Sequence, residues 1–286
     1  MAFYSPLRYP GGKNKLAKFV TLVCETNNIS GHYVEPYAGG AGVALFLLLE
    51  GHVSKITIND FDLSIYAFWY AILEHTDEFC DLIEKTEVSV KNWKKLKQVQ
   101  RNKKDASLLD LGFSTFFLNR TNRSGILDGG IIGGLYQKGY YKMDCRFNKT
   151  SLIERIRKIA AHKEKINLRH LDALELIKEI QKVSKNSSTI FYFDPPYYLK
   201  GESLYMNAYE YGDHEAVSNA IKKIKNINWI VSYDNVSEIN NLYSGCKKIE
   251  YSFFHTAREA KIGKEVLFFS RGLKVPNILE PTKVQL

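Results

Sequence analysis

The strongest constraint on the fold of this chain is an apolar run that stops at two prolines. Residues 190–193 (Ile-Phe-Tyr-Phe) have the composition of a buried β-strand, and Asp194-Pro195-Pro196-Tyr197 follows directly. Proline lacks a backbone N–H and fixes its own φ, so a strand cannot run on through this pair. The sequence therefore predicts a strand that ends at a fixed point, where the Asp194 carboxylate and the Pro195 carbonyl are held as two hydrogen-bond acceptors.

Two fixed acceptors at a strand end suit an exocyclic amino group as substrate. They would bind its two hydrogens and draw the nitrogen toward tetrahedral geometry, which makes its lone pair available to an electrophile. Tyr197 would place an aromatic face beside this point, on which an extruded base could stack. The simpler interpretation is a proline turn that only ends a strand.

A second strand, turn and helix occur near the N-terminus. Residues 33–37 are predicted to form a strand, the glycine-rich turn 39–42 follows, and the apolar run 43–49 is predicted to be helical. Glycines let a ligand approach the backbone, and the helix N-terminus offers free N–H groups. Asp60 ends the next predicted strand and could accept both ribose hydroxyls of a nucleoside. This pattern fits NAD, FAD or S-adenosylmethionine equally, and also a tight turn with no ligand.

Strands alternate with helices along much of the chain, which predicts an α/β sheet. The hydrophobic pattern changes between residues 89 and 165. Strand patterns are absent there, and a basic stretch precedes an aromatic run and a loop rich in Gly and Asn. We therefore expect three parts: a catalytic domain made of 1–88 and 166–274, an inserted and mostly helical domain at 89–165, and an irregular tail at 275–286.

The charge of the chain is unevenly distributed. The net charge is +9, yet Lys91 to Lys165 alone contain 18 Lys or Arg and 6 Asp or Glu, which leaves the other 211 residues at −3. Such a local excess is typical of a segment that binds a polyanion, although a solvated helical face rich in lysine would give the same count.

Other features narrow the class of protein. The N-terminal stretch has no long apolar segment typical of a secretory signal, and the most apolar run, 43–49, is too short to cross a bilayer, so we expect a soluble cytoplasmic protein. The four cysteines are too far apart in sequence to suggest a metal or redox pair, and no metal site is expected. In the N-terminal loop, Tyr9 could stack on a ligand and Lys13 could pair with a carboxylate, unless the loop is simply flexible.

Taken in order, these motifs resemble the DNA adenine methylase family, the amino-methyltransferases that include the Dam-type (alpha-group) N6-adenine enzymes. The resemblance spans nearly the whole chain and places the inserted domain between the cofactor turn and the catalytic tetrapeptide. It is carried by Tyr9-Pro10-Gly11-Gly12-Lys13, Glu35-Pro36-Tyr37-Ala38-Gly39-Gly40, Asn59-Asp60, Asn119-Arg120-Thr121, Asp194-Pro195-Pro196-Tyr197 and Lys264-Glu265-Val266-Leu267.

The resemblance implies a Rossmann-like methyltransferase sheet with helices on both faces and an inserted DNA-recognition domain. It implies methyl transfer from S-adenosylmethionine to the amino group of a flipped adenine, with Asp194, Pro195, Pro196 and Tyr197 as catalytic residues. The cofactor-binding residues would be Tyr9, Lys13, Glu35, Tyr37, Gly39, Gly40, Asp60, Asp172 and Asp194. Of these, Asp172 could equally be a helix N-cap.

The resemblance also implies that double-stranded DNA is bound by a monomeric enzyme encoded by a bacterium or phage, with no metal and no membrane partner. The DNA-binding residues would be Asn119, Arg120, Asn122 and Arg123. The segment 122–130 departs from the Dam enzymes that modify GATC, which leaves the target sequence open.

Three alternatives remain at this stage. The same chemistry could act on cytosine N4 in DNA or on adenine N6 in RNA, since the two acceptors suit any of these amino groups. The chain could be a DNA-binding regulator on a decayed methyltransferase scaffold, which the intact Asp60 and Asp194 disfavour. The glycine turn alone would also allow a nicotinamide-dependent oxidoreductase.

Overall fold

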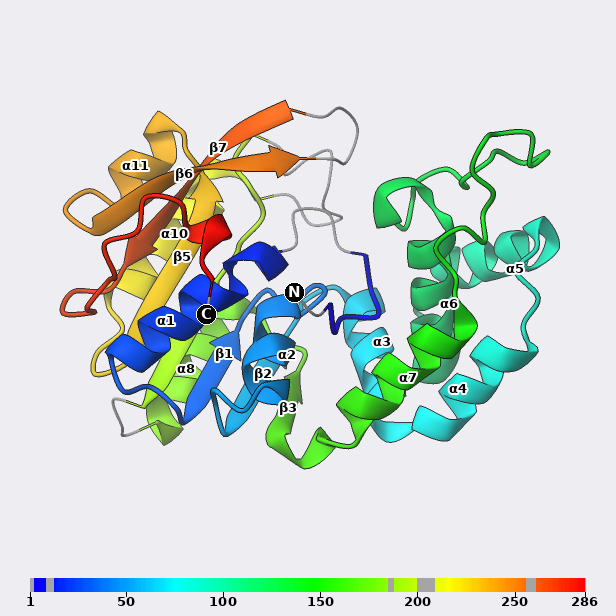
Figure 1. Cartoon of the computed structure of the whole chain (residues 1–286), viewed down its shortest axis with the longest axis horizontal. Coiled ribbons are helices and arrows are strands. Elements are labelled where there is room, and N and C mark those ends of the chain that lie inside the picture. Colours follow the sequence, from blue (N-terminus) through cyan, green and yellow to red (C-terminus); the bar gives the residue numbers. More distant parts are fainter. Residues whose placement is uncertain (1–2, 9–12, 185–187, 200–208, 256–260, 286) are drawn as a thin grey trace. The chain divides into compact units, whose positions relative to one another are not determined.

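The chain is divided into two compact units in the computed structural model, which describes residues 3–8, 13–184, 188–199, 209–255 and 261–285 (Figure 1). Unit 1 consists of Met1–Gly12 and Asp62–Glu164, and unit 2 consists of Lys13–Phe61 and Lys165–Leu286. Unit 1 is thus built from two separate pieces of the sequence.

Unit 2 is built on one seven-stranded sheet with the order β3-β2-β1-β4-β5-β7-β6. The pairs formed by β1 to β5 are parallel, whereas β7 is antiparallel to both of its neighbours. The strands are β1 (His32–Glu35), β2 (Lys55–Asn59), β3 (Ile166–Arg169), β4 (Thr189–Phe193), β5 (Asn228–Asp234), β6 (Lys247–His255) and β7 (Lys261–Phe269). This is the expected α/β sheet, and β7 makes it a mixed one.

Helices cover both faces of the sheet (Figure 1). On β4, Phe191 and Phe193 belong to an apolar layer formed with α8, α10 and α11, while Tyr192 points to the other face and stacks on Tyr33. That other face is covered by α1 and α2, as the ring contact between Phe19 and the last residue of β7 illustrates. The helices are η1 (Lys13–Leu16), α1 (Ala17–Thr26), α2 (Gly42–Leu49), α8 (Ala173–Val183), α10 (Tyr211–Lys222), α11 (Ser237–Leu242) and η4 (Pro281–Lys283).

The sheet order brings the carboxyl ends of several strands together at one edge of unit 2. The strands β1, β2, β4 and β5 all run the same way, so their carboxyl ends meet at one edge. The order changes direction between β1 and β4, and open α/β sheets bind ligands outside the strand ends at such a switch point. Asp60 and Asp194, which follow β2 and β4, therefore belong to the same edge.

Unit 1 is helical. Residues 62–164, all of which the structure describes, contain no strand apart from one isolated bridge between Asn122 and Ile131. Phenylalanine rings on α3, α4 and α6 form the core, where Phe68, Phe79 and Phe116 contact one another. The helices are α3 (Leu63–Glu74), α4 (Thr76–Lys85), α5 (Val90–Arg101), α6 (Leu108–Thr121), η2 (Arg123–Gly125) and α7 (Lys149–Ala160), with η3 (Lys163–Lys165) at the end of the unit.

The observed units differ from the predicted domains mainly in two places, since residues 1–12 and 62–88 belong to unit 1. The inserted domain was expected to begin at residue 89, but α3 and α4 belong to unit 1 and pack against its other helices. Gly112 shows how close this packing is, because a Cβ at that position would clash with the Ala67 carbonyl of α3. Residues 63–85 form two helices, because α3 ends at His75 and α4 begins there.

One strand was missed from the sequence. β6 buries Tyr251 between the exposed Glu250 and Ser252, but its two lysines and its glutamate interrupt the apolar pattern from which strands were predicted. None of the helices in the described part of the chain has the length and apolarity that a bilayer crossing requires.

Candidate active site

Asp194 lies where β4 ends, and its carboxylate is held from two sides. Oδ1 accepts a hydrogen bond from Ser232 Oγ at 2.7 Å and lies 3.2 Å from Lys13 Nζ. The side chain nevertheless stays 19% exposed, whereas that of Lys13 is only 3% exposed. Burial raises the pKa of Asp194 above its usual value, although Lys13 and Ser232 favour the ionised form. The structure thus fixes one carboxylate oxygen and leaves the group within reach of solvent.

Lys13 begins η1 and is buried beneath this carboxylate. Its ammonium also lies 4.8 Å from the centre of the Tyr197 ring and 4.0 Å from Glu265 Oε2. Burial by itself would lower the pKa of Lys13, but the carboxylates of Asp194, Glu265 and Asp234 together raise it above its usual value. The expected pairing of Lys13 with a carboxylate is therefore confirmed, and its main partner is the catalytic candidate Asp194.

Asp234 holds the chain as it leaves the tetrapeptide. It ends β5, and its two carboxylate oxygens accept hydrogen bonds from the backbone N–H groups of Tyr198 and Leu199, at 3.0 and 2.9 Å. Tyr197 itself is 3% exposed and packs in the apolar layer beside α8 and α10. The tetrapeptide is therefore anchored at both ends, through Asp194 and through the residues after Tyr197.

The glycine turn after β1 is held by two carboxylates of different character. Asp60 Oδ2 accepts a hydrogen bond from Gly39 N at 2.9 Å, and Asp60 keeps a partly exposed side chain. Glu35 Oε1 accepts from Tyr33 Oη at 2.9 Å and from Ala44 N at 3.1 Å, inside α2. Burial raises the pKa of Glu35 to about 8 despite these bonds. Glu35 is thus part of the scaffold of the turn.

Asn59 joins the ends of three strands beside Asp60. Its amide donates to Pro36 O at 2.9 Å and to Leu171 O at 3.0 Å, and its oxygen accepts from Leu171 N at 2.9 Å. Asp172 then caps α8, because its Oδ1 accepts from Leu174 N at 2.8 Å. The N-cap interpretation of Asp172 is confirmed, and its contact with a cofactor stays a prediction.

The residues at this edge fit a nucleoside cofactor. Asp60, Asp172 and Asp194 keep partly exposed carboxylates, which are acceptors suited to hydroxyl and amino groups. Tyr37, another predicted cofactor residue, is partly buried and forms a hydroxyl pair with Tyr209 at 3.0 Å. Tyr9 and the following 10–12 lie outside the described residues.

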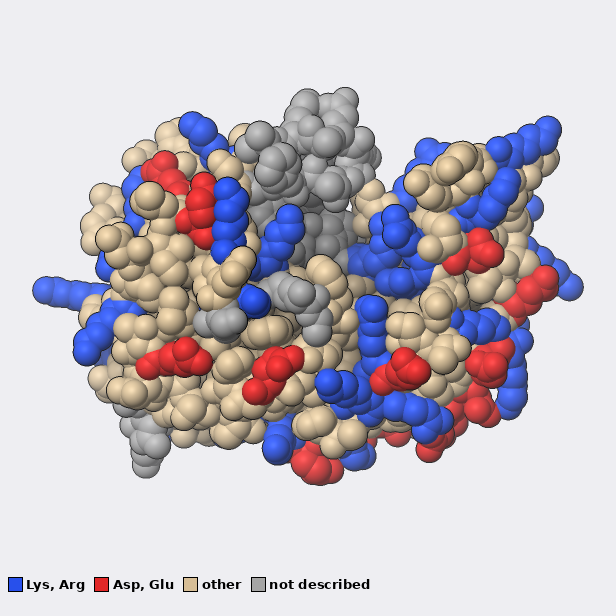
Figure 2. Space-filling view, viewed as in Figure 1, with Lys and Arg blue, Asp and Glu red and all other residues tan. Residues whose placement is uncertain are grey.

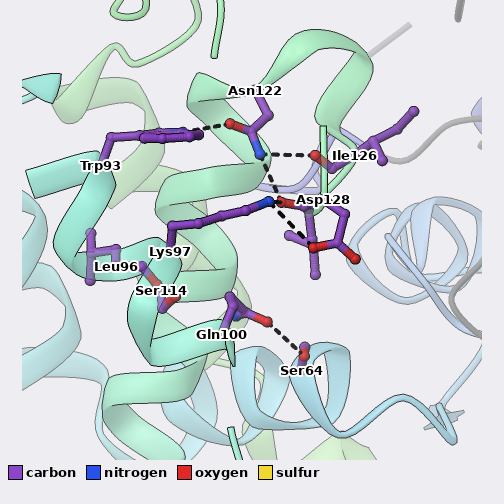
Figure 3. A network of polar contacts seen from close by, with 10 residues as sticks. Ser64, Trp93, Leu96, Lys97, Gln100, Ser114, Asn122, Ile126 and Asp128 are labelled. Carbon is purple, nitrogen blue, oxygen red and sulfur yellow. Dashed lines mark hydrogen bonds and ion pairs between the residues drawn. The ribbon is translucent and has the colours of Figure 1, made fainter. Parts of the chain in front are cut away.

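In unit 1, two of the predicted DNA-binding residues are buried and bonded inside the unit. Asn119 exchanges two hydrogen bonds with the backbone of Arg8 and donates a third to Gly125 O. Asn122 accepts from Trp93 Nε1 at 2.7 Å and donates to the carbonyls of Ile126 and Leu127 (Figure 3). The structure gives both amides internal partners, so each holds the loop that follows α6.

The two predicted arginines differ from these amides. Arg123 is exposed, whereas Arg120 is partly buried and donates to Arg146 O at 2.6 Å and to Pro6 O at 3.4 Å. Burial, and then the charges of Arg8, Arg155 and Arg146, lower the pKa of Arg120 to about 10. Arginines that gather in this way make this part of unit 1 strongly electropositive.

Lys and Arg side chains cover much of the face of unit 1 that Figure 2 shows. Within its observed bounds, the unit contains 19 Lys or Arg and 13 Asp or Glu. Most of the acidic residues precede α5, so the excess of positive charge belongs to the later helices and loops. Among the described residues, no group of His, Cys, Asp or Glu is placed to hold a metal ion.

Four residues of the Asp194 cluster were not assigned a role from the sequence. Ser232, Asp234, Tyr251 and Glu265 come from β5, β6 and β7, far along the chain from the tetrapeptide. A single usable signal was present: Asp234 and Glu265 are acidic residues within or at the end of apolar strands, and carboxylates are rarely buried without a partner. Their partner could not be named before the sheet order was known.

The family model described as "D12 class N6 adenine-specific DNA methyltransferase" matches residues 9–257 of this chain. Among solved structures, an O-methyltransferase from Bacillus cereus in complex with SAH is similar over 89% of this chain and 80% of its own, with 9% identity and a TM-score of 0.39. An rRNA methyltransferase from Streptomyces viridochromogenes covers 92% of this chain and 86% of its own, with 11% identity and a TM-score of 0.39. No curated protein matches the chain in sequence.

Proposed function

Because this chain belongs to the D12 class N6 adenine-specific DNA methyltransferases, we propose that Asp194 binds the amino group of the target adenine. The observation that carries this assignment is the position of its carboxylate. Oδ1 is held by Ser232 and Lys13, while the side chain at the end of β4 is still 19% exposed. A carboxylate fixed in this way can accept a hydrogen bond without first having to be ordered.

The residues around Asp194 would act mainly by positioning. The carboxylate and the carbonyl of Pro195 accept the two amino hydrogens of adenine, which localises the lone pair of the nitrogen. When bound, S-adenosylmethionine supplies an electrophilic methyl group on its sulfonium. Lys13 keeps Asp194 ionised in a buried site, where an unpaired carboxylate would take up a proton. Holding the reacting groups in line accounts for much of the rate gain expected of such a site.

Asp60 is our candidate for the ribose of the cofactor. It lies at the carboxyl end of β2 beside the glycine turn, and its Oδ2 already orders that turn through Gly39 N. Its carboxylate is partly exposed, and a carboxylate is a charged acceptor suited to ribose hydroxyls. Glu35 would contribute indirectly, because its bonds to Tyr33 and Ala44 hold the turn from below.

Unit 1 would bind the DNA duplex. Its arginines can contact phosphates and base edges, and extruding the target base costs a few kcal/mol that such contacts would offset. We assign DNA contact to Arg123 and Arg120, and we assign the ordering of the same loop to Asn119 and Asn122. The exposure of Arg123 and the complete set of internal bonds of Asn122 support this division.

Analysis of the product tests the proposed function. Genomic DNA free of methylation is incubated with the protein and S-adenosylmethionine, then digested to nucleosides for mass spectrometry. N6-methyladenine is expected, without N4-methylcytosine or 5-methylcytosine. Methylation at carbon needs a nucleophile such as a thiolate, and burial raises the pKa of Cys24, for example, to about 12.

Each other outcome has a defined meaning. A dominant N4-methylcytosine signal would overturn the choice of base, and transfer only to RNA would overturn the choice of nucleic acid. Binding of DNA without any transfer would identify a non-catalytic DNA-binding protein. The Asp194→Ala variant serves as the blank for background methylation.

A further inference from the structure

Glu265 is a buried carboxylate that no step of the proposed chemistry uses. It lies on β7, its residue is 0% exposed, and its Oε2 accepts a hydrogen bond from Tyr251 Oη at 2.6 Å. The strand register places Tyr251 of β6 and Asp234 of β5 directly opposite Glu265. These three side chains therefore form one row across the sheet, on the face that is covered by α1 and α2.

This row ends at the catalytic candidate through Lys13. The ammonium lies 3.2 Å from Asp194 Oδ1 and 4.0 Å from Glu265 Oε2, so two carboxylates share one cation. Exposure rises along this path, from 0% for the Glu265 side chain to 3% for Lys13 and 19% for Asp194. Only the Asp194 end of the path is open to a substrate.

A buried ion is costly unless it has partners, and a cation with one partner is held less firmly than a cation between two. Tyr251 directs Glu265 toward Lys13 because its hydroxyl is bonded to the same oxygen that approaches the ammonium. A carboxylate on the far side of Lys13 thus opposes the loss of the proton from Nζ and fixes the place of the ammonium.

We propose that Glu265 is a positioning residue, which together with Tyr251 keeps Lys13 protonated and seated on Oδ1 of Asp194, so that the remaining oxygen of Asp194 faces the substrate. This inference rests on the proposed function of Asp194. Glu265 does not touch the substrate and acts only through Lys13. Its removal should therefore change the pH range of activity more than the activity at the optimum.

The sign of the change follows from the groups that surround Lys13 and Asp194. The charge of Glu265 raises the pKa of both. Removing it lowers both, so the protonation of Asp194 and the deprotonation of Lys13 should each move to lower pH. The other titratable groups that influence the cluster are Asp234, Glu35, Tyr192, Tyr197 and Tyr251.

The first test is the pH profile of kcat for the full chain and for Glu265→Gln, measured from pH 6 to pH 10 with DNA and S-adenosylmethionine. Glutamine keeps the size of the side chain and an acceptor for Tyr251. In the wild type, kcat at pH 9.5 should stay close to kcat at pH 7.5. In Glu265→Gln, the pKa of Lys13 should fall by about two units, and kcat at pH 9.5 should then be reduced about fivefold relative to pH 7.5.

Two variants separate charge from packing. Glu265→Asp keeps the carboxylate and should retain most of the wild-type profile. Tyr251→Phe leaves the charge but removes the hydroxyl that directs it toward Lys13, so its alkaline limb should move to lower pH by less than that of Glu265→Gln. A loss of activity in Glu265→Gln that is equal at every pH would show a purely structural role and would overturn the inference.

The second test does not require methyl transfer. Protein labelled with [15N]lysine is titrated by NMR without ligand, and the Nζ signal of Lys13 is assigned from its absence in Lys13→Arg. The wild-type signal should remain that of an ammonium up to at least about pH 10, because carboxylates surround it. The midpoint should fall in Glu265→Gln.

The NMR result separates this inference from the proposed function. Titration of wild-type Lys13 below its ordinary pKa would refute the inference even if Glu265→Gln failed to fold. An unchanged midpoint in a folded Glu265→Gln would refute it as well. Wild-type protein without methyltransferase activity at any pH, but with a high Lys13 midpoint that Glu265→Gln lowers, would overturn the proposed function alone.

Discussion

The two units bury polar side chains in different ways. Unit 2 buries ionisable groups: Lys13 Nζ lies 3.2 Å from Asp194 Oδ1 and 4.0 Å from Glu265 Oε2, and Glu35 is a further buried carboxylate. Unit 1 buries amides instead, since Asn119 and Asn122 are 2% and 0% exposed and have only neutral partners. The charge of Arg123 remains at the surface, whereas Arg120 is partly buried and bonded to backbone carbonyls.

This difference fits the roles proposed for the two units. A buried ion is strongly affected by its neighbours and can be tuned by them, which suits a carboxylate that must stay ionised during a reaction. A buried amide is neutral, so it fixes a loop without depending on pH. Surface arginines bind phosphates and can be exchanged with little effect on folding. The comparison predicts that substitutions in unit 2 change chemistry and pH dependence, whereas those in unit 1 change either stability or DNA binding.

The largest effect is expected at Asp194. Asp194→Asn keeps the shape of the side chain but removes the charged acceptor, and turnover should fall at least about 10³-fold. DNA binding and the circular dichroism spectrum should persist. Ser232→Ala, which removes one hydrogen bond to Oδ1, should cost only about tenfold in kcat. Retention of most of the turnover in Asp194→Asn would rule out the assigned role.

Glu35→Gln makes unit 2 resemble unit 1 by replacing a buried carboxylate with an amide. The folded-state pKa is about 8, above the ordinary value of 4.5, so Glu35 costs stability increasingly as pH rises from 4.5 to 8 and by a constant amount above that. The variant should therefore be more stable than the wild type by a few kcal/mol at pH 9. The gain should shrink below about 1 kcal/mol at pH 5.

Urea unfolding at the two pH values measures the difference directly. Other titrating groups are common to both proteins and cancel in the comparison. A stability difference that does not depend on pH would show that Glu35 is ionised in the folded protein.

Asp60→Ala should weaken the binding of S-adenosylmethionine by about 1.5–3 kcal/mol, because ribose hydroxyls lose a charged acceptor. Calorimetry gives the dissociation constant. Since Asp60 also bonds Gly39 N, Asp60→Asn is the matched variant that retains an acceptor for the turn. Wild-type affinity in a folded Asp60→Ala protein would show that Asp60 does not bind the ribose.

Asn122→Ala tests the amides of unit 1. The substitution leaves Trp93 Nε1 and the carbonyls of Ile126 and Leu127 without their partner, which should cost about 1–3 kcal/mol of stability. Thermal unfolding reports this loss. The pH dependence of stability should be the same as in the wild type, since no charge is involved. A shift in that dependence would contradict the comparison of the two units.

The smallest effect on the fold is expected for Arg123→Ala, since the side chain is exposed. Stability should change by less than about 0.5 kcal/mol. DNA binding should lose about one unit of log–log salt slope if Arg123 contacts a phosphate. If it contacts a base edge instead, specificity should relax by about 1–3 kcal/mol at one position. Neither change in a folded variant would show that Arg123 does not contact DNA.

The sequence was most informative where a local pattern decides the structure. The strand before Asp194 and the turn beside Asp60 were predicted because prolines and glycines restrict the backbone at each point. Ser232 and Glu265 could not be placed, since their contacts with Asp194 and Lys13 arise only when β5 and β7 pair in the sheet.

The bounds of unit 1 were hidden for a similar reason. The residues of α3 are mostly apolar, which indicates burial but does not say against which neighbour. The packing of Phe68 on Phe116 and the close approach of Gly112 to the Ala67 carbonyl show that α3 belongs to unit 1. The roles of Asn119 and Asn122 could not be predicted either, because residue type alone does not distinguish an asparagine that is buried from one that contacts DNA.

The chain leaves the sheet after β2 and returns to it at β3, so residues 62–164 take the place in the sequence of the single crossover helix that usually joins two parallel strands. The strands restrict only the two ends of such a connection, which makes its interior open to exchange between related genes. The N-terminal piece complicates that exchange, because Asn119 is bonded to Arg8 and Arg120 to Pro6. A recombination event that replaced 62–164 alone would separate the new helices from the segment that their loop requires. New target specificities in this architecture should therefore arise through paired changes at the two distant places in the gene.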